Sequence, residues 1–395
     1  MHSWLNKINL RIIGSKSAKI SKLSASVMMY AVFLSVIILI LISSLFLYSY
    51  INRITITSYH IKERLRQNSS SGINLLLADT GFQYNTNYFL DLYDSGIDSV
   101  HLHKSKWGIY DLLSVRSWYQ GYQNQKKALA GGFYKRAGLK TIYLADQGSP
   151  LCVCGNTSIQ GDCMLPVAGI KRGYIEGRHF TGSTLLQGEV DFSGAMVPGP
   201  GIDQVESIIR QFDIELDQER YEVMSLDDIE SDSIYRSFFE KTLIIYDSDR
   251  LSVNQIALAG NIMLISKGDI LIGPQSQLKD IICFARNIYV LPRTKASLQC
   301  IAKDTIWIGE NCNLSYPSAL SLFPDTASES SKLIQISEGS VIEGVIADYV
   351  TSSDPEVDLT AIKIEKNSHV TGQLFTGNAM ILNGNVSGQV ITGKF

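Results

Sequence analysis

Two stretches, HVTGQLFTG (residues 369–377) and NVSGQVITG (residues 385–393), spell nearly the same nine residues sixteen positions apart. Each contains an apolar residue that is followed two positions later by glycine. The same phrase occurs earlier in the chain, at Ile159-Gln-Gly161, Ile175-Glu-Gly177, Leu186-Gln-Gly188 and Ile342-Glu-Gly344. A short unit that recurs in this way predicts an architecture of stacked repeats.

In the middle of the chain the repeat has a period of 18 residues. Apolar residues recur at this spacing in five columns, which are Leu264/Ile282/Cys300, Ile265/Cys283/Ile301, Ile270/Ile288/Ile306, Ile272/Val290/Ile308 and Leu278/Ala296/Leu314. Units of this length hold two or three short strands and bury their apolar side chains only by stacking. The period is too short for ankyrin or tetratricopeptide units, and the runs alternate as strands do. The pattern predicts a right-handed parallel β-helix over residues 151–395, with glycines at its corners.

Composition argues against one class of partner. Of 395 residues, 18% are charged, and the formal net charge is −3. A nucleic-acid-binding domain usually carries a strong positive balance or a basic patch. We therefore expect no nucleic-acid partner.

One segment predicts a membrane anchor. Residues 23–52 contain no charged residue, and residues 27–47 read VMMYAVFLSVIILILISSLFL. About 20 apolar residues cross a bilayer core, whereas the apolar part of a signal peptide has about 7–15. Tyr30, Tyr48 and Tyr50 lie near its ends, where aromatic rings prefer the membrane interface. We predict a single-pass transmembrane helix, continued as a helix to about residue 66, with the lipid bilayer as partner.

The charges on either side of this helix predict its orientation. Five basic residues precede it, and four follow it closely, at Arg53, Lys62, Arg64 and Arg66. The side with the excess of lysine and arginine usually faces the cytoplasm. Residues 1–22 are therefore expected in the cytoplasm, and the C-terminal domain in the periplasm or outside the cell.

Two further segments complete the domain prediction. Residues 67–150 contain short alternating runs rich in aromatic residues, which predict a small, mostly β connecting region. Within residues 201–237, Asp203 and Glu206 have capping-box spacing, and an apolar stripe follows, made of Val205, Ile208, Ile209 and Phe212. This segment predicts a mixed α/β insertion in the repeats, and residues 351–360 predict a shorter excursion.

Candidate metal ligands are few. The six cysteines are Cys152, Cys154, Cys163, Cys283, Cys300 and Cys312, and Cys152-x-Cys154 lacks the paired spacing of a zinc site. Burial as small apolar side chains or one disulfide fits them better. His101-x-His103 would need a third ligand, and the alternating carboxylates of residues 213–219 lack the glycine and terminal glutamate of an EF-hand calcium loop. We expect no metal site and no cofactor.

The repeats show no signature of catalysis. Glycan-cleaving enzymes need clustered acidic groups on one face of the coils. The outward positions carry mixed charges instead, among them Lys267, Asp269, Lys279 and Arg286, and no acidic pair recurs at one position. We predict that the protein is not an enzyme and has no catalytic residue. The alternative is a glycan-binding or glycan-processing protein, which would need an acidic groove with stacked aromatic rings.

The N-terminal part resembles a known family. Residues 22–78, which contain the apolar run, its polar continuation and the phrase Ser70-Ser71-Gly72-Ile73, are similar to the N-terminal helix of type IV pilus minor pilins and pseudopilins. The chain departs from that family in two ways. Gly14 is followed by Ser15, so the peptidase site of pilins is absent, and the helix also lacks the glutamate of pilins. The glycine-rich coils also resemble bactofilins, which polymerise through stacked coils. These resemblances imply an envelope protein in a pilus-like or secretion-related assembly.

These observations together predict an anchored bacterial envelope protein whose β-helix is a rigid spacer, assembly surface or binding surface. Only Lys394 and Phe395 follow Gly393, so the end of the array needs a cover. Residues 201–237 or 351–360 could fold over this end. Otherwise Val386 and Val390 would dock on a second copy or on an envelope protein partner.

Overall fold

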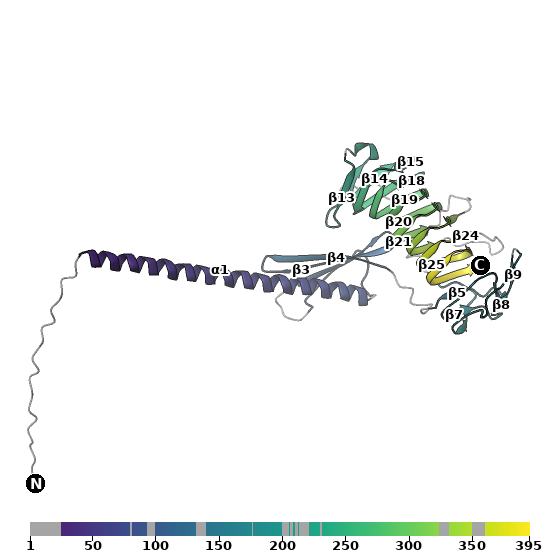
Figure 1. Ribbon diagram of the computed structural model, residues 1–395, viewed down its shortest axis with the longest axis horizontal. Coiled ribbons are helices and arrows are strands. Elements are labelled where there is room, and N and C mark those ends of the chain that lie inside the picture. Colours follow the sequence, from purple (N-terminus) through teal and green to yellow (C-terminus); the bar gives the residue numbers. More distant parts are fainter. Residues whose placement is uncertain are drawn as a thin grey trace, which may run out of the picture.

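The computed structural model describes residues 25–79, 81–92, 99–131, 140–175, 177–199, 221–229, 231–323, 332–349 and 360–395, together with 205, 208, 209 and 212. These residues form one long N-terminal helix, a small antiparallel sheet and a large stack of parallel strands (Figure 1). The expectation of a mainly β protein with one long apolar N-terminal helix is confirmed.

Helix α1 (Ala25–Ala78) has 54 residues, and its first half is apolar and exposed. Its uncharged part, residues 25–52, is about 42 Å long at 1.5 Å per residue, which is enough to cross a bilayer. The prediction that the helix ends near residue 66 is wrong. Leu65, Ile73 and Leu76 are buried against the small sheet, and this packing holds three further turns in helical form.

The small sheet lies along the last turns of α1. Its strands are antiparallel neighbours in chain order, and Val100, Leu102, Leu113 and Val115 form the face that packs on the helix. Residues 67–150 were expected to be mostly β. Strands are observed only after residue 78, where α1 ends. The strands are β1 (Asn87–Leu90), β2 (Ser99–Trp107), β3 (Tyr110–Tyr119) and β4 (Tyr122–Ala130).

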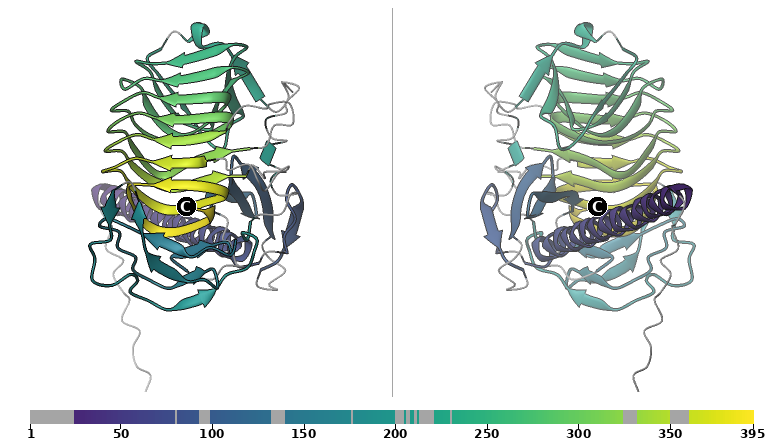
Figure 2. Two further views of the ribbon diagram at one scale, coloured as in Figure 1. Left: turned by 90° about the vertical axis from the view of Figure 1, so that its right-hand side faces the viewer. Right: turned by 90° about the vertical axis from the view of Figure 1, so that its left-hand side faces the viewer.

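The parallel stack contains most of the remaining strands, arranged in layers around one interior (Figure 2). Every pairing in this closed sheet is parallel. Two short strand pairs and one 3-10 helix lie beside it. The pairs are β6 (Leu151–Val153) with β8 (Ile170–Arg172) and β9 (Tyr174–Ile175) with β10 (Arg178–His179), and the 3-10 helix is η1 (Leu226–Asp228). The stacked strands are β5 (Ile142–Leu144), β7 (Cys163–Leu165), β11 (Val190–Phe192), β12 (Tyr221–Met224), β13 (Ser233–Arg236), β14 (Thr242–Asp247), β15 (Arg250–Val253), β16 (Ala257–Gly260), β17 (Ile262–Ser266), β18 (Asp269–Ile272), β19 (Gln277–Val290), β20 (Lys295–Ile308), β21 (Asn313–Leu322), β22 (Leu333–Ile336), β23 (Val341–Asp348), β24 (Thr360–Ile364), β25 (His369–Leu382) and β26 (Asn385–Lys394).

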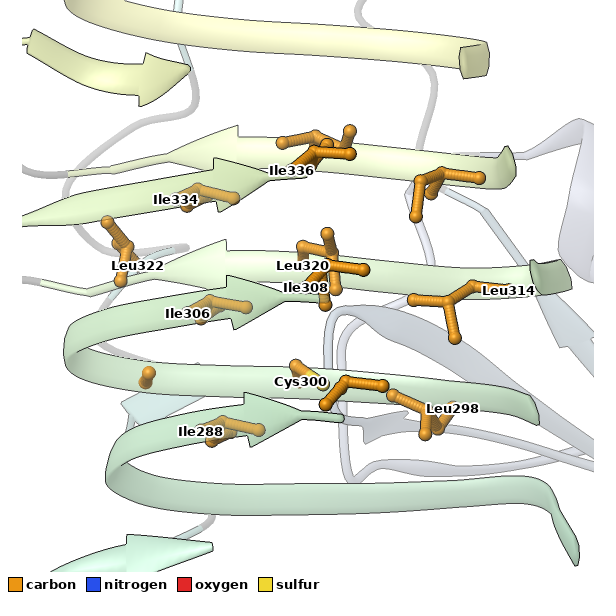
Figure 3. Packing of buried hydrophobic residues seen from close by; sticks show 14 of the residues in the cluster. Ile288, Leu298, Cys300, Ile306, Ile308, Leu314, Leu320, Leu322, Ile334 and Ile336 are labelled. Carbon is orange, nitrogen blue, oxygen red and sulfur yellow. The ribbon is translucent and has the colours of Figure 1, made fainter. Parts of the chain in front are cut away.

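Three of the five predicted columns stack as the period requires. Ile270, Ile288 and Ile306 pair in register, and so do the members of the Ile272 and Leu278 columns. Their side chains are buried in the shared interior, where residues from successive layers lie over one another (Figure 3). Stacking at the inter-strand distance thus converts short amphipathic strands into one continuous core.

The other two columns are wrong by one residue. Leu264 pairs with Cys283, and Cys283 with Cys300, whereas Ile282 pairs with Gln299. The register shifts at Asp280, which has a positive φ of 56° and is an extra residue in β19. A shift of one residue reverses the side-chain direction in a strand. Ile282 therefore points away from the interior and belongs to a second cluster on the outer face.

The repeated Val-x-Gly phrase marks a column of glycines. Gly344, Gly372 and Gly388 pair in register, with φ values of 149°, 141° and 150°. A Cβ added to Gly372 would lie 1.8 Å from the carbonyl oxygen of Gly344, and one on Gly388 would lie 1.9 Å from that of Gly372. Only glycine combines this backbone conformation with so close an approach of the next layer.

The path of the chain through the stack is not sequential. β26 pairs with β5, with Val390 against Ile142, and β5, β7 and β11 continue the stack in that order. The C-terminus accordingly lies within the stack in Figure 2. The expectation that Val386 and Val390 form an uncovered end is wrong, since Val390 is only 4% exposed. The cover comes from β5, and neither of the two segments expected to supply it pairs with β26 in the described part of the chain.

The predicted insertion at residues 201–237 is shorter than expected. β12 and β13 pair with β14 and β16, so residues 221–236 belong to the stack. Val205, Ile208 and Phe212 are buried against the outer face of the stack, in agreement with the expected apolar stripe. Asp203, Glu206, the carboxylates of residues 213–219 and residues 351–359 lie outside the described residues.

The glycine column yields a prediction. We expect Gly372→Ala to lower the free energy of unfolding by more than the ~1 kcal/mol typical of a point substitution, because the new Cβ collides with the Gly344 carbonyl oxygen. Gly377→Ala in the same strand is the matched control, since its Cβ would meet no atom within 4 Å. Thermal unfolding of the two variants would measure this. Equal midpoints would contradict the steric role of the column.

Candidate functional site

One side of the stack carries a groove of about 620 Å³ near its upper end. It crosses five successive strands, β13, β16, β19, β20 and β21. Tyr235 lies on the first of these strands and Tyr316 on the last, and their rings are 78% and 69% exposed. Large aromatic rings that stand free in solvent beside a groove are typical of ligand contact surfaces.

The groove exists because its floor is made of small side chains. Tyr235 pairs with Ala259, Ala259 with Lys279, and Lys279 with Ser297. Alanine and serine at two of these levels leave a trough in a surface that larger outward side chains would fill. Four inter-strand steps of about 4.8 Å separate the first strand from the last, so the trough is roughly 19 Å long.

The charges in the groove are mainly positive. Lys279 and Lys295 line it, and neither forms an ion pair with a described residue. Asp280 is the single carboxylate among the described lining residues, and it accepts a hydrogen bond from Ser297 Oγ at 3.3 Å. The glycan-binding alternative predicted an acidic groove, whereas this groove carries two lysines and one aspartate. In place of the stacked aromatic rings of that alternative, the groove has two separate tyrosines, on its first and last strands.

The lining lacks the arrangement that hydrolysis of a glycosidic bond uses. Such chemistry needs two carboxyl groups facing each other across the substrate, one as acid and one as base or nucleophile. The described lining residues offer Asp280 alone. The arrangement can hold a ligand by stacking on tyrosine, by hydrogen bonds to Gln277, Ser297 and Asn313, and by attraction to the two lysines.

His101 and His103 do not line this groove; they lie on the face of the small sheet that is turned away from α1. His101 Nε2 and His103 Nδ1 both contact Asn87 Oδ1, at 2.9 and 3.0 Å. Burial is the main cause that lowers the pKa of both rings, with the positive charges of Arg116 and Lys127 adding to it. Among the described residues no third ligand joins them, and no group of three metal-binding side chains is found there.

All six cysteines are free thiols in the structure. Cys163, Cys283, Cys300 and Cys312 are buried, and burial raises the pKa of the Cys163, Cys300 and Cys312 thiols. A raised pKa keeps a thiol protonated and unreactive. These side chains act as small apolar members of the core, and Cys152 and Cys154 are more accessible.

Sequence reasoning did not find the two tyrosines of the groove. They lie in different layers, and only the register of five parallel strands brings them to one side of the stack. A signal was present in the small residues Ala257, Ala259 and Ser297, which recur at outward positions. The period alone does not reveal that signal, because Ala259 pairs with Lys279, 20 positions on, whereas Lys279 pairs with Ser297, 18 positions on.

The histidine pair yields a prediction for stability. The pKa of both rings is lower in the folded state than the ordinary value near 6.5, so the unfolded state binds more protons below that pH. The stability that the neutral rings contribute is present above about pH 6.5 and is lost as the pH falls below it. We expect the unfolding temperature to drop between about pH 7.5 and 5. The drop should be smaller in the double variant His101→Gln and His103→Gln.

The control for this measurement is His60→Gln, which changes an exposed histidine on α1. This variant should follow the same pH profile as the unmodified protein. Identical profiles for the double variant and the unmodified protein would show that the pair does not contribute.

Comparisons with family models, with curated proteins and with solved structures find no match to this chain. The resemblance of residues 22–78 to pilin helices and of the glycine-rich layers to bactofilins therefore stays a prediction from the sequence. The features that bear on function are α1, the stack and the groove.

Proposed function

We propose that the protein is a membrane-anchored bacterial envelope protein without enzymatic activity. In this proposal α1 crosses the membrane once, with residues 1–22 in the cytoplasm and the folded part in the periplasm or outside the cell. The stack is a right-handed parallel β-helix that acts as a rigid spacer and as an assembly or binding surface. The observation that carries the proposal is that α1 is a single continuous helix, apolar at one end and built into the folded part at the other.

The apolar end of α1 supports insertion into lipid. Leu39, Ile40 and Leu41, for example, are more than half exposed, and three consecutive residues of a helix face all sides of it. A water-soluble protein rarely exposes so large an apolar surface, whereas a membrane-spanning helix is apolar on all sides. The first charged residue after this part is Arg53, which suits the lipid headgroup layer.

The other end of α1 is attached firmly to the small sheet. Gly72 lies directly against Val115 and Leu102, where a Cβ would come within 3 Å of both side chains. Ser117 Oγ donates a hydrogen bond to the carbonyl oxygen of Leu65 at 2.8 Å. Close packing and a buried hydrogen bond on the same two turns fix the direction of the helix relative to the sheet.

The small sheet in turn is attached to the stack through the turn between β2 and β3. Gln299, a buried residue of β20, accepts a hydrogen bond from the backbone N–H of Ile109 at 2.9 Å and donates one to the carbonyl oxygen of Trp107 at 3.1 Å. Trp107 is buried in the outer cluster of the stack. The anchor, sheet and stack are thus joined by buried contacts, which suits a spacer that holds its outer part in a fixed direction.

The description as a parallel β-helix is supported by the ladders. Strands pair in parallel and in register, layer after layer, with core columns and a glycine column along the axis. Parallel strands of one sheet are joined by right-handed connections in about 98% of cases, which favours the right-handed form. The resemblance to bactofilins and pilins supports a pilus-like or secretion-related assembly as the context of this protein.

Membrane insertion is testable with charge substitutions. We expect the full chain to stay with the membrane after alkaline carbonate extraction. The double variant Val36→Arg and Leu39→Arg should be released, because each arginine near the helix centre costs about 2.5–3.5 kcal/mol. Tyr59→Arg, an exposed position beyond the apolar part, should stay bound. Release of the unmodified chain by carbonate would refute the anchor.

The groove favours a second candidate function, which is glycan binding. Tyr235 and Tyr316 at the two ends of a roughly 19 Å trough suit an extended chain of sugar rings, whose apolar faces stack on aromatic side chains. Lys279 and Lys295 favour an acidic polysaccharide. In this role the stack would be a wall-binding or capsule-binding surface held above the membrane.

A polysaccharide panel tests this second function. If it is correct, an acidic polysaccharide binds the unmodified protein, and Tyr235→Ala or Tyr316→Ala each weakens binding roughly five-fold, which corresponds to about 1 kcal/mol for a lost aromatic contact. Phe239→Ala is the control, because Phe239 is exposed in the neighbouring turn but does not line the groove. Equal loss in all three variants would count against recognition by the groove.

A further inference from the structure

The lower end of the stack, residues 185–192, is a layer that no further strand of the described residues covers. β11 pairs with β7, which places Val190 against Cys163 and Phe192 against Leu165. Cys163 and Leu165 are fully buried in the interior, whereas Val190 is 44% exposed and Phe192 is 68% exposed. The core columns therefore continue into this layer and end in water, with apolar side chains where the next layer would lie.

This layer is built like those inside the stack. Gly188 has a φ of 157°, and a Cβ there would lie 2.3 Å from the carbonyl oxygen of Gly161. Leu185 and Leu186 pack against the same interior. An edge strand with apolar side chains and unpaired backbone groups is a ready template for another chain.

The upper end differs, because it has its own cap. η1 closes it, with Leu226 and Ile229 packed against the interior. Ser225 and Asp228 form a reciprocal capping box, and Asp227 and Asp228 give the cap a polar surface. Head-to-tail stacking would bury this acidic cap against Val190 and Phe192. The two ends are therefore not complementary to each other.

The anchor restricts which copy can reach the lower end. The stack lies crosswise to α1 and does not prolong it (Figures 1 and 2). Two copies anchored in one bilayer are related most simply by a two-fold axis along the membrane normal. This rotation turns one stack to face the other, so that like ends meet while both copies of α1 enter the same membrane.

We propose that the lower end binds the lower end of a second copy of this chain, so that Val190 and Phe192 of each copy cover the interior of the other. A contact of this kind is isologous, the commonest form of association between identical subunits. The charged residue between them does not oppose it. Asp191 is paired with Lys140, with 2.7 Å between the carboxylate and Nζ, and the same ammonium group lies 3.7 Å from the carboxylate of Asp162.

The inference rests on the proposed function, because the common membrane selects the two-fold arrangement. Its test uses the full chain in detergent and in lipid nanodiscs, with the mass of the protein component as readout. We expect the unmodified protein to have twice the mass of one chain. Phe192→Lys should halve that mass, because a desolvated ammonium group would face the partner's apolar interior. Tyr235→Lys, an equally exposed aromatic position at the upper end, should keep the doubled mass.

Three outcomes would overturn the inference. They are a single-chain mass for the unmodified protein at high concentration, a doubled mass that persists in Phe192→Lys, and open-ended polymers in place of pairs. Thermal unfolding of Phe192→Lys checks that the variant is folded, and little change is expected at so exposed a position. Carbonate extraction is read separately, so a failure of the anchor is distinguishable from a failure of pairing.

Discussion

The structure depends on one constraint: the apolar interior of each layer has to be covered by the layers on either side. No described layer encloses an interior of its own: the six core side chains of β20, for example, are covered only by the strands paired on either side of it. Stability then comes from repeated contacts between neighbours, such as the ladder of Ile270, Ile288 and Ile306. The same constraint explains why the ends of the stack differ from its middle.

Some strands of the stack are buried on both faces, so both their inward and their outward side chains have to be apolar. Leu264 and Cys283 point into the interior, while Ile265 and Ile282 point outward and are buried as well. The outward residues are covered by Trp107 of the small sheet and by the segment that contains Phe212. This outer cluster connects the small sheet, and through it α1, to the stack. The side of the stack that faces the small sheet therefore carries apolar residues at adjacent positions, whereas the groove on another side carries polar and small ones.

Much of the fold could be predicted from periodicity, because stacking acts on residues at a fixed separation. The columns of Ile270 and Ile272 follow directly from that spacing. Where both sides of a strand are buried, the periodicity does not say which of two adjacent apolar residues faces inward. Leu264 and Ile282 were placed in one column for this reason, and the bulge at Asp280 decides otherwise. The groove was beyond prediction, since its tyrosines are brought together by register and not by a motif.

The pairing of β26 with β5 also left no trace in the local sequence, yet it determines how the whole stack is assembled. Residues 140–199 form the lower layers, the chain then passes to the upper end, and it winds back down until Val390 meets Ile142. The interior of the lower layers is closed from above only when β26 is in place, and this contact joins residues far apart in the chain. Such long-range pairing forms slowly, because a large loop has to close before any contact compensates for the lost entropy. The small sheet beside α1 is made of local antiparallel pairs and does not share this delay. The order that follows is that α1 and its sheet form early, and that the stack is completed by the long-range junction of β26 with β5, from which β7 leads to the exposed β11.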